Sequence, residues 1–255
     1  MKPVFQRPKS LYDVPFSYCP GCHHSIIHRL IAESIDYFGI QERTVAVASI
    51  GCSVFLYDYF AVDTLEAPHG RAGAVATGIK RARPECIVFT YQGDGDLAAI
   101  GLAETIHTAN RGEQVAVFFV NNTVYGMTGG QMAPTTLLGQ KTTTTPLGRS
   151  IKTEGAPFKM AEMIAGLEGP AFVARVAVDT PKSILRARRA VRRAFQMQVE
   201  ENGYAFVEFL AACPTNWKMS PRDAARYVGE VLTREFPLGI FKGHLKRVKG
   251  EHDVF

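Results

Sequence analysis

Short apolar segments rich in Val, Ile and Phe alternate along the chain with longer segments in which apolar residues recur at helical spacing. This alternation is typical of βα units that build a mainly parallel sheet. We therefore predict an α/β fold with helices on both faces of a mainly parallel sheet. The expected strands are residues 44–50, 86–92, 115–121, 171–178 and 205–211, and the expected helices are residues 23–38, 71–82, 97–110, 157–167, 182–200 and 221–235.

The segment 125–156 follows neither pattern, because it is rich in Gly, Thr and Pro and has no clear periodicity. Loops of this length inside a compact domain usually have a function or are disordered, and we expect an ordered loop over a ligand. No linker divides the chain into two cores. We expect residues 1–237 to form a single domain and residues 238–255 to form a basic C-terminal arm.

Composition narrows the class of protein only a little. The 255 residues are 46% hydrophobic and 21% charged, which is ordinary for a globular chain. No stretch approaches the roughly 18 apolar residues of a membrane span, and the amino terminus has no apolar signal segment, so we expect a soluble, cytoplasmic protein. The net charge of +5 comes mostly from scattered basic residues with few interleaved aromatics. We therefore expect neither nucleic acid nor a membrane as a partner.

The sequence Gly93-Asp94-Gly95-Asp96 follows an expected strand and opens an expected helix. Backbone N–H groups and the positive end of a helix suit a phosphate at this position. Asp94 would repel a diphosphate unless a divalent cation lay between them, and Mg²⁺ commonly joins carboxylates to phosphates. A second ligand should come from the end of a neighbouring strand, because parallel strands present their carboxyl ends at one edge. Asn122 meets this requirement 28 residues after Asp94.

The pair of motifs, GDG and then NN, resembles the thiamine-diphosphate motif of transketolase-like and decarboxylase-like enzymes. The resemblance implies that Asp94, the side-chain oxygen of Asn122 and the backbone carbonyl of Val124 hold Mg²⁺. Gly93, Gly95 and Asp96 would then lie beside the diphosphate.

Two other interpretations fit these residues. Gly93, Gly95 and Ala98 also match a dinucleotide-binding fingerprint, although the next strand supplies no acidic residue for a ribose. GDGD can also be a tight turn and Asn-Asn a strand terminator, since these residues are common in turns.

Five cysteines in an intracellular chain of this size favour metal, redox chemistry or burial over a disulfide framework. Cys19 and Cys22 form a C-x-x-C pair, and Cys52 and Cys213 each follow an expected strand at the edge that carries Asp94. Four thiolates there can hold either zinc or a four-iron, four-sulfur cluster. A one-electron acceptor beside thiamine diphosphate converts decarboxylation into oxidation, and zinc cannot accept electrons, so the cofactor favours the cluster.

Cys86 begins an expected interior strand, where a buried, inert thiol is the simpler interpretation.

The motifs CPGC, SIGCS, PHGRA, GDGDLAAIG, NNTVYGMTGGQ and ACPT together resemble the β subunit of 2-oxoacid:ferredoxin oxidoreductases, from about residue 15 to residue 240. The resemblance implies a thiamine-diphosphate-binding fold with a 4Fe-4S cluster on Cys19, Cys22, Cys52 and Cys213. It also implies a thiamine site that contains Ile50, Gly51, Cys52, Ser53, His69, Gly95, Asp96, Gly126, Met127 and Thr128.

The reaction implied by the resemblance is CoA-dependent oxidative decarboxylation of a 2-oxoacid to acyl-CoA and CO₂, with electrons passing through the cluster to ferredoxin. An α subunit would supply a Glu that activates the cofactor, so the chain alone should be inactive, and γ/δ or ferredoxin-like subunits would complete the complex. His69 and Arg71 are candidates to meet the substrate carboxylate, with His69 as the catalytic candidate, although either could instead cap a helix.

Phe55, Leu56, Met127 and Leu137 suggest an apolar wall that suits a branched-chain 2-oxoacid such as 2-oxoisovalerate, and loop detail resembles the 2-oxoisovalerate type. The alternatives are 2-oxoglutarate or pyruvate as substrate, a non-redox thiamine-dependent decarboxylase subunit, and a zinc-stabilised interaction module. The charges of the basic helix around residues 182–193 indicate a solvated face. The alternative is that this helix docks an acidic ferredoxin or a partner subunit.

Overall fold

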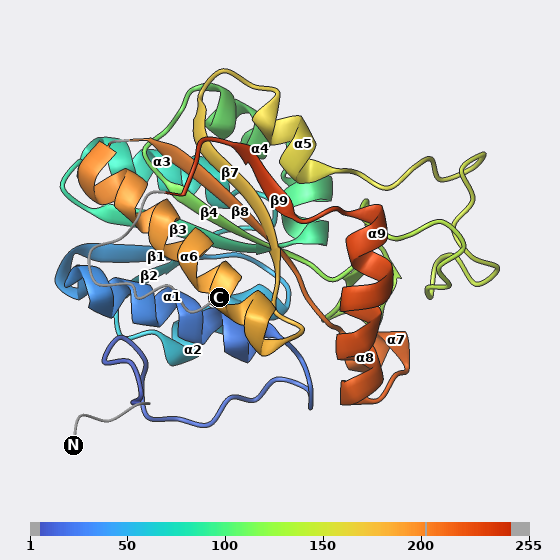
Figure 1. Ribbon diagram of the computed structural model, residues 1–255. Coiled ribbons are helices and arrows are strands. Elements are labelled where there is room, and N and C mark those ends of the chain that lie inside the picture. Colours follow the sequence, from blue (N-terminus) through green and yellow to red (C-terminus); the bar gives the residue numbers. More distant parts are fainter. Residues whose placement is uncertain (1–5, 202, 246–255) are drawn as a thin grey trace.

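The computed structural model describes residues 6–201 and 203–245. A seven-stranded sheet with the order β2-β1-β3-β4-β8-β7-β9 forms the centre of the molecule, with helices on both faces (Figure 1). The first six strands in this order are parallel to their neighbours, and β9 is antiparallel to β7. The predicted α/β fold with a mainly parallel sheet is confirmed. The strands are β1 (Thr44–Ala48), β2 (Asp63–Glu66), β3 (Ile87–Gly93), β4 (Ala116–Asn121), β7 (Pro170–Ala177), β8 (Tyr204–Leu210) and β9 (Gly239–Lys242).

Each of the six predicted segments contains helix, with differences at the ends, and two short α-helices, Leu56–Tyr59 and Pro214–Trp217, lie outside them. The segment predicted as residues 97–110 begins as a π-helical turn, Gly95–Ile100, before α4, and the segments after α6 and α8 also pass through π-helical turns. Among the described residues, no helix has the length and apolar character needed to span a membrane. The α-helices are α1 (His24–Phe38), α2 (Leu56–Tyr59), α3 (Ala72–Ala82), α4 (Leu102–Asn110), α5 (Met160–Ala165), α6 (Pro181–Gln196), α7 (Pro214–Trp217), α8 (Pro221–Tyr227) and α9 (Thr233–Glu235).

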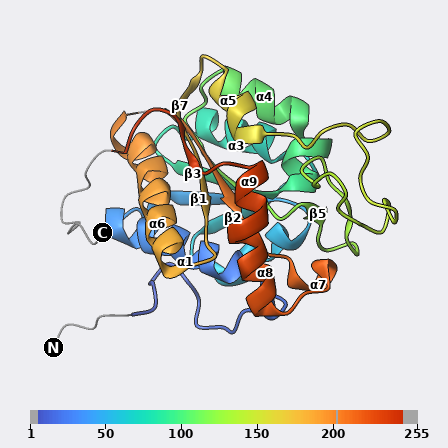
Figure 2. The same ribbon diagram turned by 45° about the vertical axis from the view of Figure 1, so that its right-hand side comes forward.

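Helices α1 and α6 cover one face of the sheet, and α3, α4 and α5 cover the other (Figures 1 and 2). Successive strand side chains point to opposite faces, so each interior strand contributes to two cores. In β3, Phe89 and Tyr91 pack with α1 and α6, whereas Val88 packs with α3 and α5. Burial on both faces explains why these strands are continuous apolar runs in the sequence.

The two outer strands, β2 and β9, were not predicted. Both are short edge strands with largely exposed side chains, so neither shows the apolar run that marks an interior strand. Residues Gly239–Lys242 belong to the expected C-terminal arm, and they pair with β7 as an antiparallel edge strand. The remainder of the arm from residue 246 lies outside the described residues, and the division into one domain and an arm stays a prediction.

The basic helix α6 uses several of its arginines inside the protein. Arg188 pairs with Glu33 of α1, and the guanidinium of Arg192 lies 4.3 Å from the ring centre of Tyr37. Arg193 is buried and pairs with Glu201. The prediction of a solvated face therefore holds for only part of the helix, because its inner side is packed against the fold.

The outer part of the long loop projects from the body of the molecule (Figures 1 and 2). The loop begins with a two-stranded hairpin, β5 (Val124–Tyr125) and β6 (Gln131–Met132). The buried guanidinium of Arg149 then donates hydrogen bonds to backbone carbonyls at Pro134, Thr136 and Gly155 over 2.6–2.9 Å. One side chain thus replaces the backbone pairing that a helix or sheet would supply.

A buried polar network sits beneath the carboxyl ends of the central strands. Arg175 on β7 is fully surrounded and pairs with Glu208 on β8 at 2.9 Å and with Glu162 on α5. Glu208 also accepts a hydrogen bond of 2.8 Å from the side chain of Asn121, the last residue of β4. This network fixes the direction of Asn121 and leaves the next residue, Asn122, at the rim.

Replacing Arg175 by Met should destabilise the protein by ~3–5 kcal/mol, because Glu208 would remain buried without its cation. Chemical denaturation of the purified chain measures this change. The double replacement Arg175→Met with Glu208→Gln should recover part of the loss, since no unpaired charge is left. An Arg175→Met protein as stable as the wild type would contradict this account of the network.

Candidate functional site

A cavity opens where β1, β3 and β4 end, and it collects segments that are far apart in the sequence. All eleven residues predicted to contact the cofactor line this cavity, together with the three predicted Mg²⁺ ligands. His24 and Tyr125 also line it and were not singled out from the sequence. The lining residues are His24, Ile50, Gly51, Cys52, Ser53, His69, Gly93, Asp94, Gly95, Asp96, Asn122, Val124, Tyr125, Gly126, Met127 and Thr128.

Asp94 lies at the tip of β3 and is 2% exposed. Its carboxylate accepts hydrogen bonds from the backbone N–H of Gly95 at 3.0 Å and from the hydroxyl of Thr135 at 2.7 Å. Among the described residues no cation pairs with it, and burial raises the pKa of Asp94 to about 7. A buried carboxylate with free lone pairs and no cationic partner is suited to binding a metal ion.

Asn122 and Val124 flank a residue in an unusual backbone conformation. Thr123 between them has a φ of +64°, in the left-handed region that residues with a side chain rarely adopt. Its carbonyl accepts a hydrogen bond from Thr136, and its hydroxyl accepts one from Gln140. The long loop therefore holds the bend at the end of β4, and such strained positions are common at functional sites.

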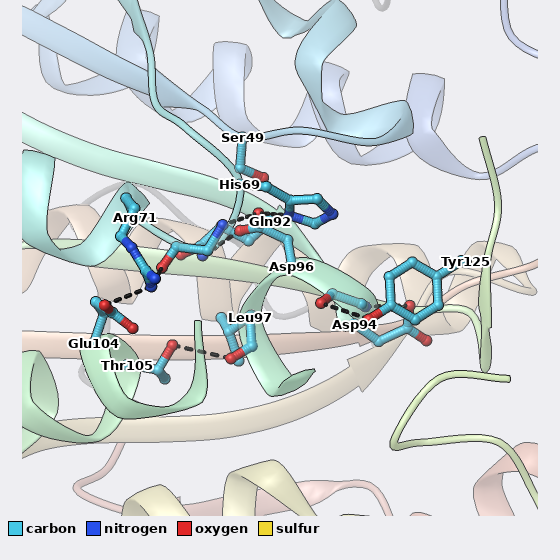
Figure 3. A network of polar contacts seen from close by, with 12 residues as sticks. Ser49, His69, Arg71, Gln92, Asp94, Asp96, Leu97, Glu104, Thr105 and Tyr125 are labelled. Carbon is cyan, nitrogen blue, oxygen red and sulfur yellow. Dashed lines mark hydrogen bonds and ion pairs between the residues drawn. The ribbon is translucent and has the colours of Figure 1, made fainter. Parts of the chain in front are cut away.

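Asp96 lines the cavity and also anchors the Pro-His-Gly-Arg turn (Figure 3). One carboxylate oxygen accepts hydrogen bonds from His69 Nδ1 at 2.6 Å and from the backbone N–H of Gly70, and the other accepts one from Gln92. Because an ionised carboxylate only accepts, the proton on His69 lies on Nδ1. This orientation leaves Nε2 of His69 as the free ring nitrogen.

Arg71 does not offer a free guanidinium to a substrate. It pairs with Glu104 of α4 at 2.5 Å, as Figure 3 shows, and is therefore already neutralised. The turn before it packs closely on the π-helical turn after Asp94: a Cβ added to Gly70 would lie 2.7 Å from the backbone nitrogen of Gly101. Glycine at position 70 thus permits the contact that places His69.

Four of the five cysteines gather beside this cavity. Cys52 lines it, and a Cβ placed on Gly126 would lie 3.3 Å from Sγ of Cys52 and 3.8 Å from Sγ of Cys213. Burial, together with the charges of the other cysteines, raises the pKa of Cys22 to about 12, with Cys19, Cys52 and Cys213 all acting on it. Neighbouring thiols of this kind ionise when a cationic centre binds them.

Cys86 lies apart from this group, just before β3, where it is half-buried and neighbours Lys80. All five cysteines are free. Among residues 6–201 and 203–245, no three His, Cys, Asp or Glu side chains converge closely enough to form a ready-made site for a single metal ion.

Buried aromatic and histidine side chains pack directly under the cysteines. Tyr18 donates a hydrogen bond to the carbonyl of Cys52 at 3.1 Å and lies 2.8 Å from Nε2 of His28. His24 Nδ1 lies 2.6 Å from the hydroxyl of Tyr91. Burial lowers the pKa of His24 to about 3, so His24 is neutral near pH 7.

Two of the four residues expected to form an apolar substrate wall lie elsewhere. Leu56 is fully buried in the core between the sheet and α1, and Leu137 is buried against α8. Met127 lines the cavity, and Phe55 is half-buried and packs against the main core. The expected wall is therefore wrong for Leu56 and Leu137, because the chain after Cys52 turns Leu56 back toward the interior.

Comparison with known proteins shows the family to which the chain belongs. A family model described as the C-terminal TPP-binding domain of thiamine pyrophosphate enzymes matches residues 49–209. A 2-oxoglutarate synthase subunit, KorB, from Methanocaldococcus jannaschii is 38% identical over 223 residues, which cover 85% of this chain and 78% of that protein. The chain belongs to the family of 2-oxoacid:ferredoxin oxidoreductase subunits.

Two further relatives support this placement. The ketoisovalerate oxidoreductase subunit VorA of Methanothermobacter thermautotrophicus is 51% identical over 251 residues, 94% of this chain and 53% of that protein. The present chain thus spans about half the length of that relative. The structure of 2-oxoglutarate:ferredoxin oxidoreductase from Magnetococcus marinus, with 2-oxoglutarate, coenzyme A and succinyl-CoA bound, matches with a TM-score of 0.75 and 25% identity, over 96% of this chain and 88% of the other.

The family match separates the two halves of the site. Asp94, Asn122 and Val124 lie inside the matched segment of the thiamine pyrophosphate family, whereas Cys19, Cys22 and Cys213 lie outside it. Three of the four cysteines therefore come from the segments that flank the matched thiamine domain, and Cys52 comes from within it.

Replacing Asp94 by Asn should leave the cofactor-free chain at least as stable as the wild type at pH 8. The change removes a buried charge but keeps a partner for Thr135 and for the N–H of Gly95. The variant should not gain thermal stability when Mg²⁺ and thiamine diphosphate are added, whereas the melting temperature of the wild type should rise. Differential scanning fluorimetry measures both effects.

The matched control is Asp223→Asn, which changes an exposed carboxylate on α8. It should respond to Mg²⁺ and thiamine diphosphate as the wild type does. Equal stabilisation of the Asp94→Asn variant and the wild type would rule out Asp94 as a cofactor-metal ligand.

Proposed function

We propose that the chain is the thiamine-diphosphate-binding β subunit of a 2-oxoacid:ferredoxin oxidoreductase. The enzyme would catalyse CoA-dependent oxidative decarboxylation of a 2-oxoacid to acyl-CoA and CO₂, and pass the electrons through a 4Fe-4S cluster to ferredoxin. The observation that carries the proposal is that one cavity collects the GDG residues and Asn122 together with Cys52, which lies beside Cys213 against Gly126.

The metal and cofactor would be held at the tips of β3 and β4. The carboxylate of Asp94, the side-chain oxygen of Asn122 and the carbonyl of Val124 are the proposed Mg²⁺ ligands, and all three residues are buried. Gly93, Gly95 and Asp96 would lie beside the diphosphate, with backbone N–H groups and the start of a helical turn directed at it. A side chain at position 95 is excluded, because an added Cβ would lie 2.2 Å from the ring of Tyr125.

When bound, thiamine diphosphate would supply the nucleophilic carbon and the electron sink that decarboxylation of a 2-oxoacid requires. The chain binds and orients the reactants. His69 is the catalytic candidate: Asp96 fixes its ring, and its Nε2 is free to exchange a proton with the substrate. The residues of SIGCS and of the Gly126-Met127-Thr128 turn would enclose the same cavity from its other sides.

The proposed cluster ligands are Cys19, Cys22, Cys52 and Cys213. Support comes from their mutual proximity, and from Cys52, which belongs to both the cavity and the cysteine group. An electron leaving the cofactor would therefore have a cluster ligand in the cavity wall. Free cysteines throughout the chain fit a reducing cytoplasm.

Partner chains are part of the proposal. The acidic residues that line the cavity, Asp94 and Asp96, are both engaged at the diphosphate end, so the carboxylate that activates the far side of the cofactor would come from an α subunit. γ/δ or ferredoxin-like subunits and ferredoxin itself would receive the electrons. Exposed apolar residues on the projecting loop, with Leu147 at 95% exposure and Ile151 at 62%, are suited to contact with another chain.

A branched-chain 2-oxoacid such as 2-oxoisovalerate is the favoured substrate. Met127 gives the cavity an apolar side chain, no Arg or Lys is among its lining residues, and Arg71 in the neighbouring turn pairs with Glu104. The relative named as a ketoisovalerate oxidoreductase subunit, at 51% identity, supports the same class. Pyruvate and 2-oxoglutarate are the competing substrates.

The anaerobically purified protein should contain about four irons per chain and should be brown. Cys213→Ser should lose most of the iron, whereas Cys86→Ser, which changes the cysteine outside the group, should keep it. Iron and zinc are measured by elemental analysis, and the cluster by electron paramagnetic resonance after reduction. A protein with zinc in place of iron would indicate the zinc-stabilised interaction module, and one with neither metal would indicate a non-redox decarboxylase subunit.

The purified chain should show no 2-oxoacid-dependent dye reduction until the α subunit is added, because the activating carboxylate is missing. In the reconstituted complex, 2-oxoisovalerate should give a higher kcat/KM than pyruvate or 2-oxoglutarate. Full turnover by the chain alone would contradict the need for the partner. A preference for 2-oxoglutarate would overturn the substrate assignment but not the family of reaction.

A further inference from the structure

Helix α7 joins the two halves of the site. It follows Cys213 directly and consists of four residues, Pro214–Trp217. One of its side chains reaches the cysteine group, and another reaches the backbone at the proposed metal site. Neither side chain lines the cofactor cavity itself.

The amide of Asn216 is shared between two acceptors. Its Nδ2 donates a hydrogen bond of 3.2 Å to Sγ of Cys213 and one of 2.8 Å to the carbonyl of Gly126. The carbonyl of Gly126 only accepts hydrogen bonds, and so does Sγ of Cys213 when its thiol is ionised. Both N–H groups of the Asn216 amide are therefore used. Gly130 on the loop packs against the other side of Asn216, where an added Cβ would lie 3.1 Å away.

Gly126 is the point where the cavity wall meets the sulfurs. It lines the cavity with Met127 and Thr128, and a Cβ at this position would come within 3.8 Å of Sγ of both Cys52 and Cys213. Asn216 therefore holds the turn of the cofactor cavity directly against two of the four cysteines. A shift of this turn changes the hydrogen bond that Cys213 receives.

We propose that Asn216 is a positioning residue that couples the cofactor cavity to the cysteine cluster through its shared amide. This inference rests on the proposed function, because it requires a cluster on the cysteines. Hydrogen bonds to cluster sulfurs stabilise the reduced, more negative state and so raise the reduction potential. Since coupling between two sites is reciprocal, cofactor binding at the Gly126 turn changes the potential of the cluster, and reduction of the cluster changes the affinity for the cofactor.

The neighbouring Trp217 provides a matched control on the same helix. Its indole N–H donates a hydrogen bond of 3.1 Å to the carbonyl of Asn122, and its ring packs against Tyr227. The side chain of Trp217 thus contacts the metal side of the site, and the hydrogen bond from its backbone N–H to the carbonyl of Cys213 does not depend on the side chain. A purely structural role of α7 predicts the same outcome for both residues, whereas the proposed coupling does not.

The test uses the assembled oxidoreductase, purified anaerobically as wild type, Asn216→Leu and Trp217→Phe. Potentiometric titration monitored by electron paramagnetic resonance gives the cluster potential with and without Mg²⁺ and thiamine diphosphate, and calorimetry gives the cofactor Kd. We expect Asn216→Leu to have a more negative potential, to lose the shift that the cofactor causes in the wild type, and to bind the cofactor about three- to tenfold more weakly. Trp217→Phe should weaken cofactor binding but keep both the wild-type potential and its shift.

The inference is overturned if Asn216→Leu keeps the wild-type potential and its response to the cofactor. The proposed function survives that result as long as the wild type contains iron. Absence of iron from the wild type removes the proposed function itself. If Asn216→Leu does not assemble, the isosteric Asn216→Asp replaces it and should lower the potential, because a negative oxygen then faces the sulfur. An unchanged potential in that variant also overturns the inference.

Discussion

Parallel strands end together, and this constraint places the whole site. The registers of β1, β3, β4 and β8 bring the residues after each strand to one edge of the sheet. Cys52 follows β1, Asp94 follows β3, Asn122 follows β4 and Cys213 lies beyond β8. Four short segments with polar or cysteine side chains, separated by helices in the sequence, therefore meet at this edge. Each of them lies only a few residues beyond the end of its strand.

The same constraint made the central part of the site predictable from the sequence. The buried strands are apolar on both faces, so their ends are visible as the positions where Gly, Asp, Asn or Cys follows. The edge strands β2 and β9 and the contacts of Arg149 could not be predicted in this way, because they depend on pairing and burial that only the folded chain creates. Leu56 and Leu137 show the complementary limit: proximity to a motif in sequence does not determine whether a side chain faces a cavity or a core.

The two asparagines at the end of β4 illustrate how neighbouring identical residues acquire different roles. Side chains alternate along a strand, so Asn121 points inward to Glu208 and the network of Arg175, while Asn122 remains at the rim. The charge network under the sheet thus contributes to the geometry of the site as well as to stability. Thr123 then reverses the backbone, and its left-handed conformation persists because Thr136 and Gln140 hold it.

The stem of the long loop closes on itself before its tip begins. Gly139 and Arg149 are joined by a backbone hydrogen bond, as are Arg149 and Gln140, so the residues that support Thr123 and Asp94 lie on the inner side of this closure. The intervening segment 141–148 makes no hydrogen bond to Thr123 or Asp94 among the described contacts. Changes in the length or sequence of this tip can therefore suit a different neighbour while the hydrogen bonds that hold Thr123 and Asp94 stay in place.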